Sequence, residues 1–172
     1  SLCCHNCSAA YLIKEGIPRI LPDNMNREAV RTAESFGYEW KRFNKLDKKN
    51  EDEFLSYLHP LSPSDFKGKV VLDAGCGMGK FTYYACQYNA KEVIAVDLSD
   101  SVEVAYEHTK DFPNVHVIQA DIYNLPLRKQ FDFIYCRFVF QNLEKRKQAM
   151  RELYQCLNPG GRLLIVDVDD GF

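Results

Sequence analysis

The sequence predicts an α/β fold with a doubly wound parallel sheet. Short apolar runs, rich in β-branched and aromatic residues, recur from residue 70 onward, as is typical of strands covered on both faces. Stretches with helical spacing lie between several of these runs, and turn signals separate the two kinds of segment. Because strands and helices alternate, we expect right-handed crossovers, which make the strands parallel.

The predicted core has strands over residues 70–72, 93–96, 115–118, 131–135 and 163–168. Helices are predicted over 80–88, 101–110 and 144–156. The last helix ends before the strong stop signal Asn158-Pro159-Gly160-Gly161. No helix is expected between the third and fourth strands, because Asn124-Leu125-Pro126 is typical of a loop.

The residues ahead of this core predict a short N-terminal extension. A cysteine-rich start, the turn signal Glu15-Gly16 and two prolines indicate a small ribbon or loop rather than a helix. A helix with one apolar stripe is expected over 24–40, and a shorter helix over 54–58. The chain therefore divides into a ribbon-like segment, a helical lead-in that covers the core, and the core itself, which are residues 1–22, 23–66 and 67–172.

Composition favours an ordinary cytoplasmic protein. The 172 residues are 46% hydrophobic and 27% charged with a formal net charge of -2, which gives no general argument for nucleic acid or an anionic membrane. No apolar run approaches the roughly 20 residues that span a bilayer, and no secretory signal is recognisable. Seven cysteines, an odd number, predict reduced thiols. Because the chain starts at Ser1 and ends at Phe172, just after a predicted strand, we expect a fragment with an incomplete C-terminal side.

Polar residues gather at the carboxyl ends of the predicted strands, where an open parallel sheet binds its ligands. The first strand continues into the glycine-rich segment 73–79 (Asp-Ala-Gly-Cys-Gly-Met-Gly), and the second ends at Asp97. Asp121 follows the third strand and Arg137 follows the fourth. Since these ends meet at one edge of the sheet, we expect a single binding site there.

The glycine spacing excludes two common phosphate sites. Gly75, Gly77 and Gly79 allow a tight turn and close approach of a ligand, and the next helix is expected to point free N–H groups at it. A dinucleotide fingerprint needs a third glycine five positions after the first, where Lys80 stands. A P-loop also fails, because no Gly-Lys-Ser/Thr follows at the required distance. Taken alone, the loop is also compatible with a turn that serves only strand-to-helix geometry.

Two aspartates extend the site. Asp97 can accept both hydroxyls of a ribose, and Ser99 or its neighbour can cap the next helix, which would leave Asp97 free. Asp121 can accept from an adenine amino group while Leu98 and Ile122 flank the ring. Each aspartate, taken alone, is more typical of a helix cap or a turn than of a binding site.

The combined pattern, over about residues 69–170, resembles class I S-adenosylmethionine-dependent methyltransferases. The resemblance implies a Rossmann-like core with five strands present and S-adenosylmethionine as cofactor. The glycine loop would hold the methionine part, the second strand end the ribose, and the third strand end the adenine. The implied cofactor-binding residues are Asp73, Gly75, Cys76, Gly77, Gly79, Asp97, Leu98, Asp121, Ile122 and Arg137.

Residues 35–43 look like the lead-in of a bacterial subgroup of these enzymes, in which a helix and loop cover the cofactor. Phe36, Tyr38 and Trp40 then either line the substrate cavity or simply pack on the sheet.

The segment Cys4-His5-Asn6-Cys7 is similar to half of a zinc ribbon found before such domains. Structural zinc wants four ligands, usually in two close pairs. Cys4 and Cys7 supply one pair, so zinc is expected only if further ligands lie upstream of this chain.

The implied reaction transfers a methyl group from a sulfonium to a nucleophile by in-line displacement. No catalytic base can be nominated, because no histidine falls at a strand end. The fourth strand is not followed by Asn/Asp-Pro-Pro-Tyr/Phe, a motif common in enzymes that methylate bases, which favours a small-molecule acceptor. Two alternatives stay open, a non-catalytic cofactor-binding domain and an RNA (ribosomal-RNA-type) methyltransferase. The RNA alternative depends on one basic cluster, which consists of Lys41, Arg42, Lys45, Lys48 and Lys49.

Overall fold

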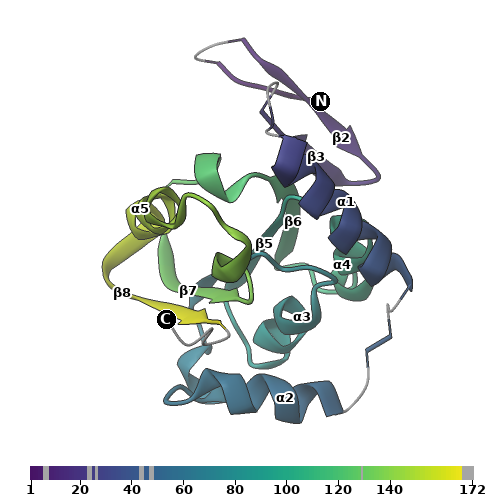
Figure 1. The fold of residues 1–172 in the computed structure, drawn as a ribbon. Coiled ribbons are helices and arrows are strands. Elements are labelled where there is room, and N and C mark those ends of the chain that lie inside the picture. The colour runs from purple at the N-terminus through teal and green to yellow at the C-terminus, as the bar shows by residue number, and fades with distance from the viewer. Residues whose placement is uncertain are drawn as a thin grey trace.

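An eight-stranded sheet forms the centre of the molecule in a computed structural model (Figure 1). The structure describes residues 1–5, 8–22, 25, 27–42, 45–46, 49–128 and 130–167, without the side chains of 27–30, 32, 41, 49 and 50. The strand order is β1-β2-β3-β6-β5-β4-β7-β8. The strands are β1 (Leu2–Cys3), β2 (Ala10–Lys14), β3 (Ile17–Ile20), β4 (Val70–Ala74), β5 (Glu92–Asp97), β6 (Val115–Ala120), β7 (Phe131–Arg137) and β8 (Leu157–Val166). All neighbours from β3 to β8 pair in parallel.

Helices cover both faces of the sheet, which confirms the predicted doubly wound architecture. The α-helices are α1 (Arg27–Arg42), α2 (Lys49–Leu58), α3 (Lys80–Gln87), α4 (Val102–Thr109) and α5 (Arg146–Cys156). Between β6 and β7 the described residues form the 3-10 turn η2 (Ile122–Asn124) and no α-helix, as expected. Among the described residues, no helix combines the length and the apolar character that crossing a membrane requires.

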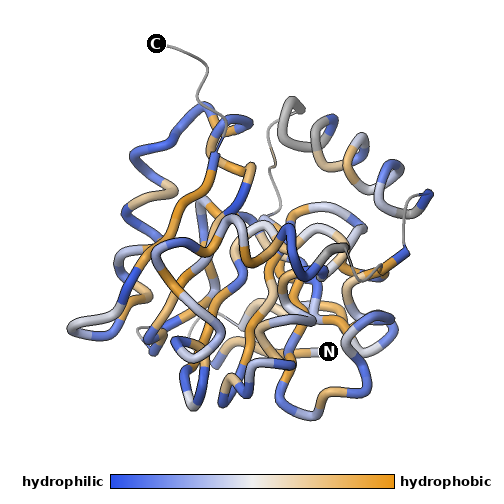
Figure 2. The backbone as a smooth tube through the Cα atoms, turned by 90° about the horizontal axis from the view of Figure 1, so that it is seen from below, coloured by the Kyte–Doolittle hydropathy of each residue, from blue (hydrophilic) through white to orange (hydrophobic). Residues whose placement is uncertain are grey.

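Adjacent residues of the central strand β4 point into different cores. Val71 packs with Phe54 of α2 and with residues of α3, whereas Leu72 packs with Leu153 of α5. Val71 and Leu72 are 1% and 0% exposed, so this strand has no solvent face. Burial on both sides explains why the strand is a continuous apolar run rather than an alternating one. Figure 2 shows the same distribution, with apolar colour along the inner strands and hydrophilic colour on the outer turns.

The N-terminal ribbon is a β-hairpin that belongs to the main sheet. Strands β2 and β3 meet at Glu15 and Gly16, which both have positive φ (53° and 82°) as tight hairpin turns require. Strand β3 then pairs in parallel with β6, and Ile17 is 1% exposed within the core beside α4. The sequence predicted a ribbon here but gave no sign that it would extend the sheet.

The last strand differs most from its prediction. β8 starts at Leu157, not 163, because Leu157 pairs with Phe131 before the segment 158–161 leaves the ladder. Pairing resumes between Phe133 and Arg162. The predicted stop signal therefore forms an irregularity inside a longer strand. Residue 168, the predicted end of this strand, lies outside the described residues.

Candidate functional site

The carboxyl ends of β4, β5, β6 and β7 border one cavity of about 680 Å³. Side chains from α1, α2 and the segment after β7 complete its wall. Nine of the ten residues that the sequence analysis singled out line this cavity. They are Asp73, Gly75, Cys76, Gly77, Asp97, Leu98, Asp121, Ile122 and Arg137.

Gly79 does not line the cavity. It precedes α3 in the left-handed conformation (φ 77°), and a Cβ on it would lie 2.8 Å from Cα of Ala105 in α4. A glycine at this position therefore lets α3 and α4 approach each other closely. Its contribution to the cavity is indirect, through the position of the loop.

The glycine loop turns its first N–H groups toward the protein rather than toward the cavity. Gly75 N and Cys76 N both donate to the carbonyl oxygen of Val96 in β5, at 2.7 and 3.0 Å. Gly77 N donates to Oδ2 of Asp97 at 2.9 Å. These three loop N–H groups have their acceptors in β5. The free N–H groups expected at a ligand belong to the helix that follows the loop, and that expectation stays a prediction.

Asp97 is not free, contrary to the prediction from the sequence. Besides Gly77 N, its carboxylate accepts from Ser99 N at 2.8 Å and from Ser99 Oγ at 2.7 Å. The residue that caps α4 is Ser101, without a side-chain cap hydrogen bond. A carboxylate offers about four acceptor positions, and three are used here. Asp97 thus ties the glycine loop to the end of β5 and retains limited capacity for a ligand.

Asp73 is a buried carboxyl at the end of β4. It is 4% exposed and accepts a hydrogen bond of 2.7 Å from Thr82 Oγ1. Burial raises the pKa of Asp73 to about 7, and the nearby charge of Asp97 acts in the same direction. Burial also raises the pKa of the Cys76 thiol far above its ordinary value, so this sulfur is protonated at neutral pH.

Asp121 begins the turn η2. Its Oδ1 accepts from Tyr123 N at 2.9 Å, and the residue is 9% exposed. Within the described part of the chain, no group donates to its Oδ2. Leu98 and Ile122 line the cavity on the neighbouring strand ends. This end of the cavity therefore offers one open acceptor between apolar side chains.

Arg137 forms the opposite, cationic end. Its Nη2 donates to Oε1 of Glu53 in α2 at 2.7 Å, and Oε2 of Glu53 contacts Nζ of Lys80. Partial burial raises the pKa of Glu53, but these two cations outweigh it and lower the pKa overall. Nε of Arg137 is buried without a described partner. The guanidinium lies 4.2–4.5 Å from three ring centroids, which belong to Tyr57, Phe81 and Phe138.

Glu53 and Lys80 escaped the sequence analysis as site residues. Glu53 stands in a charged stretch with no motif, and Lys80 was considered only as the residue that breaks a dinucleotide fingerprint. Glu53 and Lys80 are 27 residues apart in the chain, and their contact joins α2 to the start of α3. Only the fold reveals it.

Helix α1 contributes side chains to the wall of the cavity, among them Phe36 and Trp40. That this helix covers a cofactor and that these two side chains meet a substrate stay predictions. Tyr38 is 69% exposed, so its predicted place at the cavity or on the sheet is wrong. The indole Nε1 of Trp40 lies 3.2 Å from where a Cβ on Gly77 would be, and Gly37 packs against the backbone of Asp100.

The predicted half zinc site is described only in part. Cys4 lies in the described residues, whereas Cys7 lies outside them. Among the residues that the structure describes, no group of three histidine, cysteine or acidic side chains is arranged to hold a metal ion.

The fold and the cavity together define an α/β domain with a cavity at the carboxyl ends of a doubly wound sheet, the place where open parallel sheets bind ligands. The sequence family described as a methyltransferase domain matches residues 72–165, and the chain belongs to this family. The family implies S-adenosylmethionine as the cofactor, which the resemblance had predicted.

Relatives of known name differ in what they act on. The chain is 32% identical over 159 residues to a malonyl-[acyl-carrier protein] O-methyltransferase of Pectobacterium atrosepticum, covering 88% of this chain and 58% of that protein. It is 28% identical over 102 residues to a tRNA U34 carboxymethyltransferase of Pseudoalteromonas atlantica, covering 58% and 32%. An S-adenosylmethionine-dependent methyltransferase of Mesorhizobium loti superposes with a TM-score of 0.58 at 26% identity, covering 70% and 55%. The chain thus spans little more than half the length of these relatives, or less.

Proposed function

We propose that this chain is the cofactor-binding core of an S-adenosylmethionine-dependent methyltransferase with a small-molecule acceptor. The observation that carries the proposal is the single cavity at the carboxyl ends of four parallel strands, lined by the glycine loop and by Asp73, Asp97 and Asp121. The family match supports the same conclusion.

The residues present fit this cofactor. The cavity of about 680 Å³ falls within the usual range of small-molecule sites. Oδ2 of Asp121 lacks a donor and Nε of Arg137 lacks an acceptor among the described groups, so each end has a polar atom that a ligand can satisfy. In the proposal, Asp121 with Leu98 meets the adenine, Asp97 the ribose, and the glycine loop with Arg137 the methionine part.

The bound cofactor would supply an electrophilic methyl group on sulfur. The chain itself would contribute orientation and exclusion of water. Trp40 covers the glycine loop at Gly77, and Phe36 and Phe138 also line the cavity. Since the buried thiol of Cys76 is protonated, it is no candidate for a base at neutral pH. Positioning of the two reactants in this cavity is the catalytic effect that we assign to these residues.

The shape of the site favours a small acceptor. Apolar side chains such as Phe36, Val139 and Leu143 line part of the cavity, beside polar ones. An acceptor group must reach the methyl group inside this cavity. The relative named for malonyl-[acyl-carrier protein] is consistent with a small acyl group as the part that enters.

An RNA acceptor is the second candidate, and the relative named for tRNA supports it. Of the basic cluster that the sequence offered, the side chains of Arg42 and Lys45 are described and exposed, whereas Lys48 lies outside the described residues and the side chains of Lys41 and Lys49 are not described. Binding of RNA that weakens steeply with salt would favour this candidate over the first. Absence of such binding would eliminate it.

Titration calorimetry with S-adenosylhomocysteine tests the proposed site. Asp97→Ala should lower the affinity by about 1.5–3 kcal/mol, as expected for lost hydrogen bonds to a charged group. Asp111→Ala, an exposed turn aspartate after α4, serves as the matched control and should bind like the parent chain. Equal affinity of all three proteins would contradict the assignment of Asp97.

A further inference from the structure

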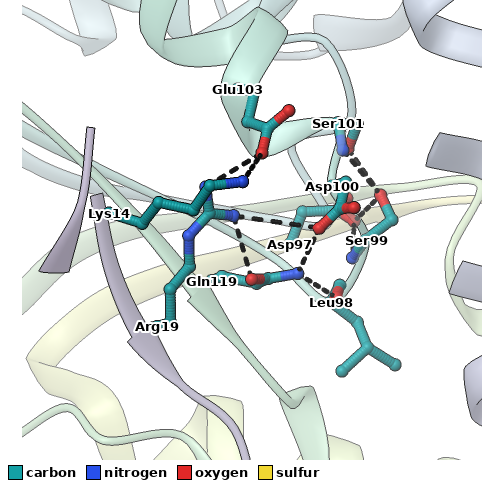
Figure 3. A network of polar contacts seen from close by, with 9 residues as sticks. All are labelled: Lys14, Arg19, Asp97, Leu98, Ser99, Asp100, Ser101, Glu103 and Gln119. Carbon is teal, nitrogen blue, oxygen red and sulfur yellow. Dashed lines mark hydrogen bonds and ion pairs between the residues drawn. The ribbon is translucent and has the colours of Figure 1, made fainter. Parts of the chain in front are cut away.

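The hairpin residue Arg19 is connected to the proposed adenosine end of the cavity by a chain of polar contacts (Figure 3). Its side chain is 9% exposed. Nη1 donates to Oε1 of Gln119 at 2.9 Å, and Nη2 donates to Oε1 of Glu103 at 3.2 Å. Nη1 also lies 3.9 Å from Oδ1 of Asp100. A buried guanidinium that reaches three separate elements is a poor candidate for a solvated surface group.

Gln119 connects Arg19 to the residues that follow the neighbouring strand β5. Its Nε2 donates to the backbone oxygen of Leu98 at 3.0 Å and to Oδ1 of Asp100 at 3.2 Å. The amide orientation is determined by its neighbours, because one side faces N–H donors of Arg19 and the other faces two oxygens. Gln119 is 6% exposed, so an unpaired amide there would be costly.

The segment that receives these contacts carries two of the proposed cofactor residues. Leu98 lines the cavity, and the preceding residue Asp97 accepts from the glycine loop at Gly77 N. A shift of the Leu98 carbonyl would therefore move the apolar wall and the carboxylate together. Strand β3 pairs with β6 so that Arg19 lies directly beside Gln119 in the register. The hairpin therefore places the guanidinium within hydrogen-bond distance of the Gln119 amide.

We infer that Arg19 is a positioning residue for the adenosine part of the cofactor, acting through Gln119 on the segment 97–98. The N-terminal hairpin is then part of the cofactor site, although Arg19 itself does not line the cavity. This inference rests on the proposed function.

The test is calorimetric titration of adenosine and of S-adenosylhomocysteine into the whole chain, at a temperature where every variant is fully folded. Arg19→Leu keeps the apolar stem but removes all donors, and the dissociation constants of both ligands should rise about ten-fold, as for the loss of one strong hydrogen bond. Lys14→Leu is the matched control, since Lys14 contacts the same oxygen of Glu103 at 3.3 Å from the same hairpin but is 55% exposed. It should change either constant less than about two-fold.

Gln119→Glu tests the second step of this connection. The carboxylate keeps the acceptor for Arg19 but puts an oxygen in place of the donor to Leu98 and Asp100, so the melting temperature should fall. Titrated at a temperature where the variant is fully folded, both ligands should also bind about ten-fold more weakly. Unchanged dissociation constants in Arg19→Leu and Gln119→Glu, with normal binding by the parent chain, would overturn the inference. Failure of the parent chain to bind either ligand would instead overturn the proposed function.

Discussion

The two sides of the cavity are built by different means. On the sheet side, each aspartate is bound to a group nearby, as Asp97 is to Gly77 and Asp121 to Tyr123. On the cover side, α1 and α2 reach the cavity through contacts between residues far apart in the chain, such as Glu53 with Arg137. The sheet side is therefore fixed by the core, whereas the cover side depends on packing of separate helices. We expect substitutions on the sheet side to alter global stability more than those on the cover side.

The largest effect is expected from pH acting on Asp73. The unfolded chain ionises this carboxyl near pH 4, whereas the folded chain does so only near pH 7. The unfolded state therefore binds fewer protons in this interval, and the fold loses stability as the pH rises from about 4 to about 7. For a shift of this size the loss approaches about 4 kcal/mol.

Asp73→Asn should remove this dependence, because the amide oxygen can still accept from Thr82 without ionising. Urea unfolding of both proteins at several pH values measures the effect. Between about pH 4 and pH 7, the free energy of unfolding of the parent chain should fall relative to that of the variant. Parallel pH profiles would show that burial of Asp73 does not govern stability on the sheet side.

Gly79→Ala should have the next largest effect. A Cβ there would meet the backbone of Ala105 at 2.8 Å, and φ is 77°, so close contact and left-handed strain combine. We expect the free energy of unfolding to fall by about 3 kcal/mol. Gly68→Ala is the control, since its φ is 71° but no atom lies within 4 Å. It should cost only about 1 kcal/mol, and equal losses in the two variants would argue against a packing role for Gly79.

Gly37→Ala probes the cover side and should have the smallest effect. Its Cβ would lie 3.5 Å from the backbone nitrogen of Asp100, which is ordinary contact. Because alanine favours a helix more than glycine does, we expect a gain of up to about 1 kcal/mol in urea unfolding. A clear loss would mean that α1 packs as tightly as the sheet side, and the contrast between the two sides would fail.

The core could be predicted from the sequence because its signals are local. Apolar runs, helical spacing and the glycine loop identified β4 to β7 and the three helices between β4 and β8, and strand-end residues identified the cavity. Contacts between residues that are far apart in the chain have no such local signal. The pairing of β3 with β6 joins residues 100 positions apart, as at Arg19 and Gln119. The hydrogen bond from the loop backbone to Asp97 could not be predicted either, because the residue type does not show which acceptor a backbone N–H takes.

The chain contains a single tryptophan, and it is Trp40. Its indole covers Gly77, at the point where α1 closes over the glycine loop. Tryptophan fluorescence of the unlabelled protein, excited selectively over that of the ten tyrosines, therefore reports from one known location. A ligand that enters beneath α1 should change the polarity around this one fluorophore, and stopped-flow mixing would resolve how fast the cover responds. Entry of the ligand and unfolding of the chain can thus be followed separately, with no probe attached.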